Sequence, residues 1–450
     1  MNTILKLSWY GIILLWLLQS CTAPAKITPA TALENYLKND DKTFKWEIDN
    51  VNESDQFKLY DLRLVSQNWR GHEWSHQLSV LVPEVVEHDE ALLFISGGSN
   101  KKGEPNWKQP DDANIKMMSM IAQQNNALVA VLFQVPNQPL YNDLTEDELI
   151  SFTFHNFRND KDYSWPLLFP MVKSAVKAMD AIQEFSKETL DRAVKSFLVS
   201  GASKRGWTTW LTGTQDKRVQ AIAPMVIDML NMPASIKYHL EAWGSYSIQI
   251  QDYVNLGIAQ DVDTPDGQDL VAMVDPYSYR SQLTMPKLIF NGTNDEYWPV
   301  DAIKHYIDDI PGDNYLHYVP NAGHGLGDKQ QAIQALNSFF GIMLNGENYP
   351  VYNWDIEAPE NELILQIKNK DNNLAGVNIW SSESGDRDFR DNKFIREKVH
   401  FQNQEELNIA VSYPDSGYRA FYVELIYPDQ HGELFSLSTR MYVIDSQNLY

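Results

Sequence analysis

Cysteine is almost absent from this 450-residue sequence, in which Cys21 is the single one. A disulfide framework within the chain is therefore excluded. Basic residues are also scarce, because 37 Lys and Arg stand against 60 Asp and Glu, and the formal net charge is −23. Affinity for nucleic acid comes mainly from Lys and Arg that release counterions from phosphates, so we expect no nucleic-acid partner.

Phosphate-binding loops and dinucleotide-binding glycine runs are missing after the expected strands, so we expect no cofactor. We assign no His-Glu-x-x-His motif and no closely spaced pair of His or Cys, so a metal-dependent hydrolase is not favoured. What the sequence does contain is 43% hydrophobic and 12% aromatic residues. That content is enough to build at least one large packed core, which argues against a mainly disordered chain.

The N-terminal segment has the anatomy of a signal peptide. Lys6 precedes an apolar stretch over residues 7–18 that is short for a membrane span. The run Leu18-Gln19-Ser20-Cys21 resembles the bacterial lipobox, in which the cysteine is lipidated and the leader is removed in front of it. Because Thr22 follows Cys21, we expect a lipid-anchored envelope protein of the outer membrane of a Gram-negative bacterium. The alternative is an uncleaved anchor helix.

Short β-rich runs alternate with helical or polar segments between about Phe57 and Val319. This alternation predicts an α/β fold with an open, mostly parallel sheet covered by helices. Continuously apolar runs, such as 92–95, are typical of strands buried on both faces. The eight expected strands are 57–65, 77–82, 91–95, 127–133, 196–200, 220–226, 287–290 and 315–319.

Two segments depart from this alternation. Residues 229–285 are aromatic and amphipathic, which predicts either a helical cap over a pocket or an ordinary insertion at the sheet edge. After an expected helix at 330–344, five short alternating strands predict a small β-sandwich-like domain. The predicted division is a lipoprotein signal peptide at 1–21, a tether at 22–30, an α/β domain at 31–344 with its cap at about 229–285, and the β-domain at 345–450.

Ser203 is the expected nucleophile. It follows the apolar strand at 196–200 and precedes a plausible helix, so it occupies a strand-to-helix turn that exposes its hydroxyl. Gly201 gives this turn backbone freedom. The motif departs from Gly-x-Ser-x-Gly, because Arg205 takes the place of the second glycine, which is delayed to Gly206.

A base and an acid follow in the chain order that α/β-hydrolases use. Asp295 lies just beyond the strand at 287–290, where functional groups collect in open α/β sheets. His324 lies in a glycine-flanked loop after the strand at 315–319. Taken alone, Asp295 could be a turn residue, and Glu296 is a less favoured acid, but the order Ser203, Asp295, His324 predicts a catalytic triad.

The oxyanion donors are expected from the backbone. The N–H of Lys204 is the first, and the second is assigned to Gly97 or Gly98 in the loop after the strand at 91–95. A plain glycine turn is the alternative for that loop. The charges of Lys204 and Arg205 could meet an anionic substrate group, although such charges more often pair with structural carboxylates.

The run Gly201-Ala202-Ser203-Lys204-Arg205-Gly206-Trp207, with Asn294-Asp295-Glu296-Tyr297-Trp298 and Ala322-Gly323-His324, resembles the PhoPQ-activated pathogenicity-related protein family. The delayed glycine belongs to that family's pattern, and the resemblance extends from about Leu33 into the β-rich tail. It implies an α/β-hydrolase core with Ser203, Asp295 and His324 as triad. The resemblance does not supply a substrate.

Two functions remain open on the sequence. The first is a cell-envelope serine hydrolase that cleaves a small-molecule ester or a peptide through an acyl-enzyme. The second is an inactive, lipid-anchored binding or signalling protein that keeps the fold and uses the cap and the β-domain as interaction surfaces. An intact triad favours the first.

Overall fold

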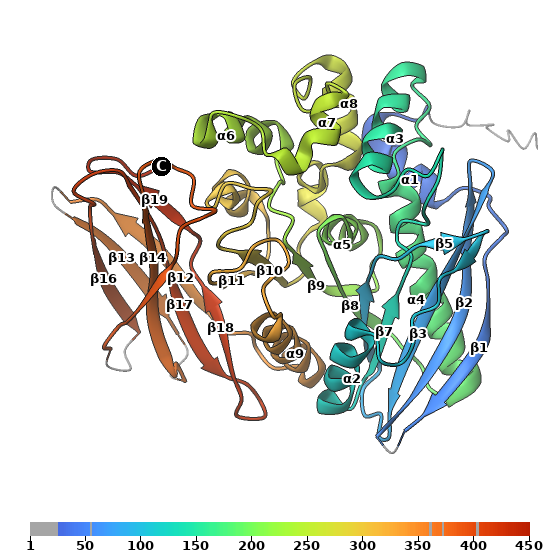
Figure 1. Cartoon of the computed structure of the whole chain (residues 1–450). Coiled ribbons are helices and arrows are strands. Elements are labelled where there is room, and N and C mark those ends of the chain that lie inside the picture. The colour runs from blue at the N-terminus through green and yellow to red at the C-terminus, as the bar shows by residue number, and fades with distance from the viewer. Residues whose placement is uncertain (1–25, 55, 360–361, 371–372, 402–404) are drawn as a thin grey trace, which may run out of the picture.

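The computed structural model describes residues 26–54, 56–359, 362–370, 373–401 and 405–450. The chain forms a long twisted sheet with helices on both faces and a β-rich C-terminal part beside it (Figure 1). The helices are α1 (Pro29–Leu37), α2 (Ala113–Asn125), α3 (Glu146–Asp160), α4 (Leu168–Leu190), α5 (Lys204–Gln215), α6 (Met232–Trp243), α7 (Gln251–Asn255), α8 (Pro265–Val274) and α9 (Gln330–Asn345), with short 3₁₀ turns η1 (Ile248–Ile250), η2 (Pro276–Gln282), η3 (Ala302–His305) and η4 (Ile307–Asp309).

The central strands are parallel from β7 to β11, in the order β7-β4-β8-β9-β10-β11. Antiparallel strands β1, β2 and β3 extend one edge. The bounds are β1 (Lys45–Glu53), β2 (Phe57–Trp69), β3 (His72–Pro83), β4 (Glu90–Ile95), β7 (Leu128–Leu132), β8 (Ser196–Ala202), β9 (Val219–Met225), β10 (Lys287–Gly292) and β11 (Asn314–Val319), with a separate hairpin of β5 (Asn100–Lys101) and β6 (Glu104–Pro105).

Side chains that alternate along the central strands contribute to two hydrophobic cores, one on each face of the sheet. Leu92 and Leu93 are both fully buried, yet they point to opposite faces because side chains alternate along a strand. Leu93 belongs to the core that includes α4 and α5, whereas Leu92 belongs to the core that includes α2 and α9. Burial on both faces explains why these strands are continuously apolar.

All eight expected strands are present, and the expected α/β fold is confirmed. The expected number of strands in the sheet is wrong, because the described residues form a sheet of 14 strands and not of eight. The polar and largely exposed edge strand β1 adds to it, and its exposure explains why the sequence pattern missed it. At the other edge, Leu316 of β11 pairs with Ser438. The same sheet therefore continues into the C-terminal strands.

The C-terminal part is a two-layer arrangement of antiparallel strands. One layer is the continuation of the main sheet, and the other is a three-stranded sheet whose core residues include Leu365 and Ile409. Both lie in one core with Val423 and with Phe340 of α9, so the sandwich packs on the α/β part through shared apolar contacts. The strands are β12 (Tyr352–Glu357), β13 (Glu362–Asn369), β14 (Gly376–Ser384), β15 (Ile395–Lys398), β16 (Glu406–Ser412), β17 (Tyr418–Pro428), β18 (Leu434–Ser438) and β19 (Tyr442–Ile444).

Helices between β9 and β10 cover the carboxyl end of the sheet. This segment holds α6, α7, α8 and the turns η1 and η2, which lie above the central strands in Figure 1. Helix α3, inserted between β7 and α4, contacts α7 and α8 and completes the cover. The sequence pattern did not assign α3 to it.

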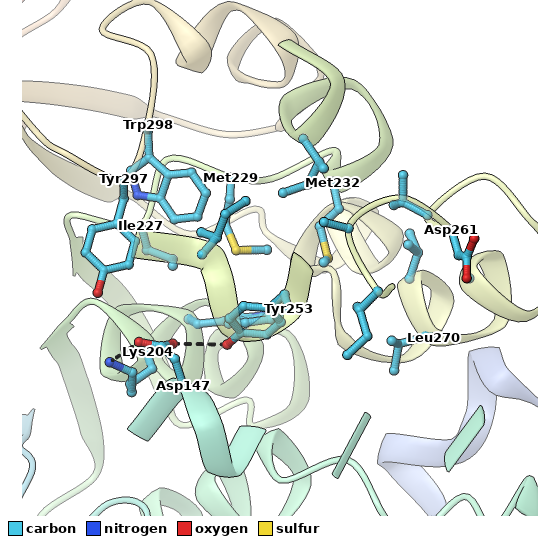
Figure 2. A pocket seen from close by; sticks show the side chains of 18 of the residues that line it. Asp147, Lys204, Ile227, Met229, Met232, Tyr253, Asp261, Leu270, Tyr297 and Trp298 are labelled. Atoms are coloured by element: carbon cyan, nitrogen blue, oxygen red, sulfur yellow. Dashed lines mark hydrogen bonds and ion pairs between the residues drawn. The ribbon is translucent and has the colours of Figure 1, made fainter. Parts of the chain in front are cut away.

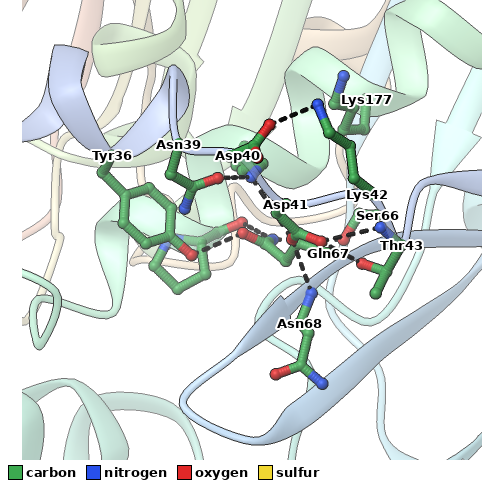
Figure 3. Close-up of polar contacts among 12 residues, drawn as sticks. Tyr36, Asn39, Asp40, Asp41, Lys42, Thr43, Ser66, Gln67, Asn68 and Lys177 are labelled. Carbon is green, nitrogen blue, oxygen red and sulfur yellow. Dashed lines mark hydrogen bonds and ion pairs between the residues drawn. The ribbon is translucent and has the colours of Figure 1, made fainter.

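Helix α1 begins at Pro29, inside the segment expected to be a tether, so the tether prediction is wrong for residues 29 and 30. Polar contacts then fix the following segment on β2 (Figure 3). Tyr36 Oη donates to Gln67 at 2.7 Å, and Asp41 accepts from the Asn68 backbone N–H at 2.8 Å. Residues 36–41 are thereby part of the folded domain.

The signal peptide and Cys21 lie outside the described residues, so lipidation stays a prediction. Within the described ranges, no helix combines the length and apolarity that crossing a membrane requires.

Candidate active site

Ser203 lies at the turn between β8 and α5, with φ 60° and ψ −129°. A non-glycine residue adopts such angles only when its surroundings enforce them. Gly201 lets the chain turn this tightly, because a Cβ at position 201 would lie only 2.9 Å from both Cβ and the carbonyl oxygen of Arg205. The strained turn presents the hydroxyl at the carboxyl end of the sheet.

Gly206 explains the delayed glycine of the motif. A Cβ at this position would lie 2.8 Å from the carbonyl oxygen of Met225 and 2.9 Å from Cγ2 of Ile227. Helix α5 can therefore approach β9 this closely only with glycine at position 206.

The structure brings Ser203, Asp295 and His324 into one chain of hydrogen bonds. His324 Nε2 lies 2.8 Å from Ser203 Oγ, and Nδ1 lies 3.0 and 2.9 Å from the two carboxylate oxygens of Asp295. Since a carboxylate only accepts, Nδ1 carries the proton and Nε2 is free to accept the hydroxyl proton. This arrangement matches a nucleophile, a base and an orienting acid.

Neighbours of Asp295 hold the acid and the base in place. Glu296 accepts the His324 backbone N–H at 2.9 Å, whereas the ring nitrogen Nδ1 bonds to Asp295, so Asp295 is the carboxylate that orients the ring. The backbone N–H of Tyr297 donates to Asp295 at 2.9 Å. The Tyr297 ring stacks on the imidazole with centroids 4.0 Å apart. Sequence reasoning missed this aromatic residue, although its position two residues after the acid was visible.

Lys204 and Arg205 pair with carboxylates at the start of α3. Arg205 binds Glu146 with two nitrogens, each at 2.7 Å, while Lys204 lies 3.1 Å from Glu146 and 3.0 Å from Asp147. Burial alone would raise the pKa of Glu146, but the charges of Arg205 and Lys204 lower it to about 2. Of the two sequence interpretations, pairing with structural carboxylates describes these charges.

The expected oxyanion donors separate in the structure. Lys204 is the first residue of α5, so its N–H has no acceptor within the helix. Gly97 lines a cavity together with Ser203, and a Cβ there would meet the Arg205 guanidinium at 2.5 Å. Gly98, with φ 151°, turns towards Gln134 and Gln138 and is not among the residues that line this cavity.

Two cavities meet at Ser203. The first, called here the apolar cavity, is about 60 Å³ and lies between the covering helices and residues 297–298. Figure 2 shows Lys204, Asp147 and Tyr253 at one end of it and Leu270 and Asp261 at the other. The second, called here the histidine-side cavity, is about 260 Å³ and is lined by Gly97 and His324.

A loop of the C-terminal part holds both loops that carry the acid and the base. Asn294 Nδ2 lies 2.9, 3.1 and 2.7 Å from the carbonyl oxygens of Phe389, Arg390 and Asn392. Asn321 donates to the carbonyl of Phe394 at 3.0 Å and accepts its N–H at 2.8 Å. The segment 389–394, called here the clamp loop, thus fixes residues adjacent in sequence to Asp295 and close to His324.

A buried carboxyl lies near Asp295. Asp228 is 4% exposed and accepts from the Tyr306 hydroxyl at 2.6 Å. Burial, with smaller contributions from the charges of Asp295 and Asp301, raises the pKa of Asp228 to about 7. Asp228 is therefore protonated through the weakly acidic range.

One run with metal-binding spacing was overlooked in the sequence. His72-Glu73-Trp74-Ser75-His76 has the His-Glu-x-x-His pattern, but it lies in β3 and not on a helix. His76 is buried and lies 3.0 Å from Ser66 Oγ and 3.1 Å from the Phe133 carbonyl oxygen. No group of three or more potential ligands comes together in the described part of the chain.

A family model described as PhoPQ-activated pathogenicity-related protein matches residues 33–390. The chain belongs to this family. The autocrine proliferation repressor protein A of Dictyostelium discoideum is 31% identical over 448 residues, which cover 92% of this chain and 89% of that protein. The expected family is thereby confirmed.

Solved structures place this family member on a known fold. Acetyl xylan esterase 1 of a Thermoanaerobacterium species aligns with a TM-score of 0.50 at 15% identity, covering 70% of this chain and 93% of that one. An acetyl xylan esterase of a Paenibacillus species aligns with a TM-score of 0.48 at 14% identity, covering 69% and 92%. The chain has the α/β-hydrolase fold, and at 15% identity the likeness to acetyl xylan esterase 1 establishes the fold alone.

Proposed function

We propose that the protein is a serine hydrolase that cleaves an ester or a peptide bond through an acyl-enzyme. The observation that carries the proposal is the hydrogen-bonded chain from Asp295 through His324 to Ser203 at a strained strand-to-helix turn. A hydroxyl 2.8 Å from an imidazole nitrogen that lacks a proton is an activated nucleophile.

The reaction follows from the positions of these groups. Ser203 Oγ attacks the carbonyl carbon while His324 Nε2 takes its proton, and Asp295 stabilises the imidazolium. The N–H groups of Lys204 and Gly97 are the proposed donors to the tetrahedral oxyanion. His324 then gives its proton to the leaving group, and water, deprotonated by the same imidazole, releases the acid.

A fluorophosphonate probe tests the nucleophile on the full chain purified in detergent. We expect labelling of the wild type, none of Ser203→Ala, and a sharp fall in His324→Ala. Ser96→Ala is the matched control, because Ser96 lines the histidine-side cavity as Ser203 does but hydrogen-bonds to Asn114. This variant should be labelled as strongly as the wild type. A folded wild type that does not react would refute the proposal and favour a binding or signalling role, which the name of the Dictyostelium relative also suggests.

We also propose that the protein is lipid-anchored through Cys21 in the bacterial outer membrane. The lipobox-like run before this cysteine and the apolar stretch at 7–18 support the proposal. Membrane fractionation of cells expressing the wild type and Cys21→Ser tests it. Recovery of the wild type in the soluble fraction would contradict it.

A further inference from the structure

The apolar cavity has walls that suit a hydrocarbon group. Its lining includes Ile227, Met229, Met232, Leu270 and Val271. The charged residues that line it are paired with each other, because Asp147 lies 3.0 Å from Lys204, and Arg158 bonds to Asp261. A charged substrate group entering this cavity would lose its hydration without gaining a free partner.

The position of His324 determines how the substrate is oriented in the site. The leaving group must receive its proton from Nε2 of His324, so it lies on the side of Ser203 that the imidazole lines. Ser203 lines both cavities, but His324 lines only the histidine-side cavity, and Lys204, on the other side of the serine, lines only the apolar cavity. The part of the substrate that stays on the serine therefore faces the apolar cavity.

We propose that the apolar cavity binds the acyl part of the substrate and that the leaving group occupies the histidine-side cavity. The inference rests on the proposed function and adds the substrate class, which is esters or amides of an uncharged, apolar acid of several carbons. The apolar cavity is small, about 60 Å³, which favours unbranched acyl chains over bulky ones. The flexible side chains of Met229 and Met232 allow some adjustment of its width.

A pair of isomeric esters tests which cavity binds the acyl group. Methyl hexanoate and pentyl acetate contain the same atoms, but the first has the long chain on the acyl side and the second has it on the alcohol side. Each methylene that leaves water contributes about fourfold in kcat/KM, so we expect the full chain to prefer methyl hexanoate by at least about tenfold. An equal or greater kcat/KM for pentyl acetate would overturn the assignment.

Fluorophosphonate labelling separates this test from that of the proposed function. If Ser203 reacts with the probe but neither ester is cleaved, the acyl assignment is wrong while the activated serine stands. If Ser203 does not react, both proposals fall.

Variants in the two cavities make the test specific. Val271→Phe narrows the apolar cavity and should lower kcat/KM for methyl hexanoate about tenfold, while methyl acetate stays within about threefold. Ile333→Phe is the matched control, because Ile333 lines the histidine-side cavity, and it should affect pentyl acetate more than methyl hexanoate. Labelling of Ser203 in each variant shows that the site is folded, and the reverse pattern of losses would contradict the assignment.

Discussion

The clamp loop offers a sharp test of how the acid and the base are held. The substitution Asn294→Ala removes the amide that faces the carbonyl oxygens of Phe389, Arg390 and Asn392 at 2.9, 3.1 and 2.7 Å. An amide nitrogen has two hydrogens, so these three contacts amount to two full hydrogen bonds, one of them shared. At about 1 kcal/mol net for each, the free energy of unfolding should fall by about 2 kcal/mol.

Activity should fall more than stability alone explains. Asn294 precedes Asp295, and a displacement of the acid by about 1 Å misaligns the imidazole and costs about a hundredfold in rate. We expect kcat to decrease between about tenfold and a hundredfold, with KM little changed, because the cavities are not touched. The assay is steady-state ester hydrolysis at a temperature where urea titration shows both proteins folded.

The matched control is Asn337→Ala, which removes a buried amide contact of 2.7 Å with Asn125 between α9 and α2. This variant should lose similar stability and keep its kcat. If Asn294→Ala loses stability but keeps kcat within about twofold, the clamp loop supports the fold without positioning the acid, and the reasoning above is refuted.

Three further predictions follow from single contacts. Asp228 has a folded pKa of about 7 against 3.8 in the unfolded chain, so its stabilising contribution is complete below 3.8 and is lost as the pH rises to 7. Asp228→Asn should therefore gain about 2 kcal/mol relative to wild type between pH 5 and pH 7 in urea titrations, and equal pH dependence in the two proteins would contradict the shift. Gly206→Ala should lose about 1–3 kcal/mol of stability, because its Cβ would meet the Met225 carbonyl oxygen at 2.8 Å. Gly213→Ala would meet only the side chains of Ile222 and Met285 and should lose less, and equal urea midpoints would refute this. Tyr297→Phe keeps the ring stacked on His324 and should hold kcat within about twofold, whereas Tyr297→Ala should lower kcat about tenfold. Equal kcat in the two variants would show that the stacked ring does not position His324.

Much of the site was predictable because the fold places functional groups at strand ends. The apolar strands at 196–200, 287–290 and 315–319 are continuous enough to be recognised, and the residues just after them are Ser203, Asp295 and His324. Their hydrogen bonds follow from the parallel sheet, which aligns the carboxyl ends of neighbouring strands.

Other features depend on contacts between segments far apart in sequence. Asn294 and Asn321 look like ordinary turn residues until the clamp loop lies beside them, and α3 joins the cover over the site only through its packing on α7 and α8. Strand β1 is polar and exposed, so its pairing with β2 leaves no apolar pattern. Gly97 and Gly98 are adjacent glycines that the sequence cannot tell apart. In the structure Gly97 lies against Arg205, whereas Gly98 lies against Gln134.

The central claim is that Ser203 forms an acyl-enzyme with the help of His324. Rapid acid quenching of the full chain during turnover of p-nitrophenyl hexanoate, followed by peptide mass mapping, tests this claim directly. The account predicts a hexanoyl adduct on the peptide that contains Ser203, and no adduct in Ser203→Ala. An adduct on another residue, or turnover that persists in Ser203→Ala, would contradict it.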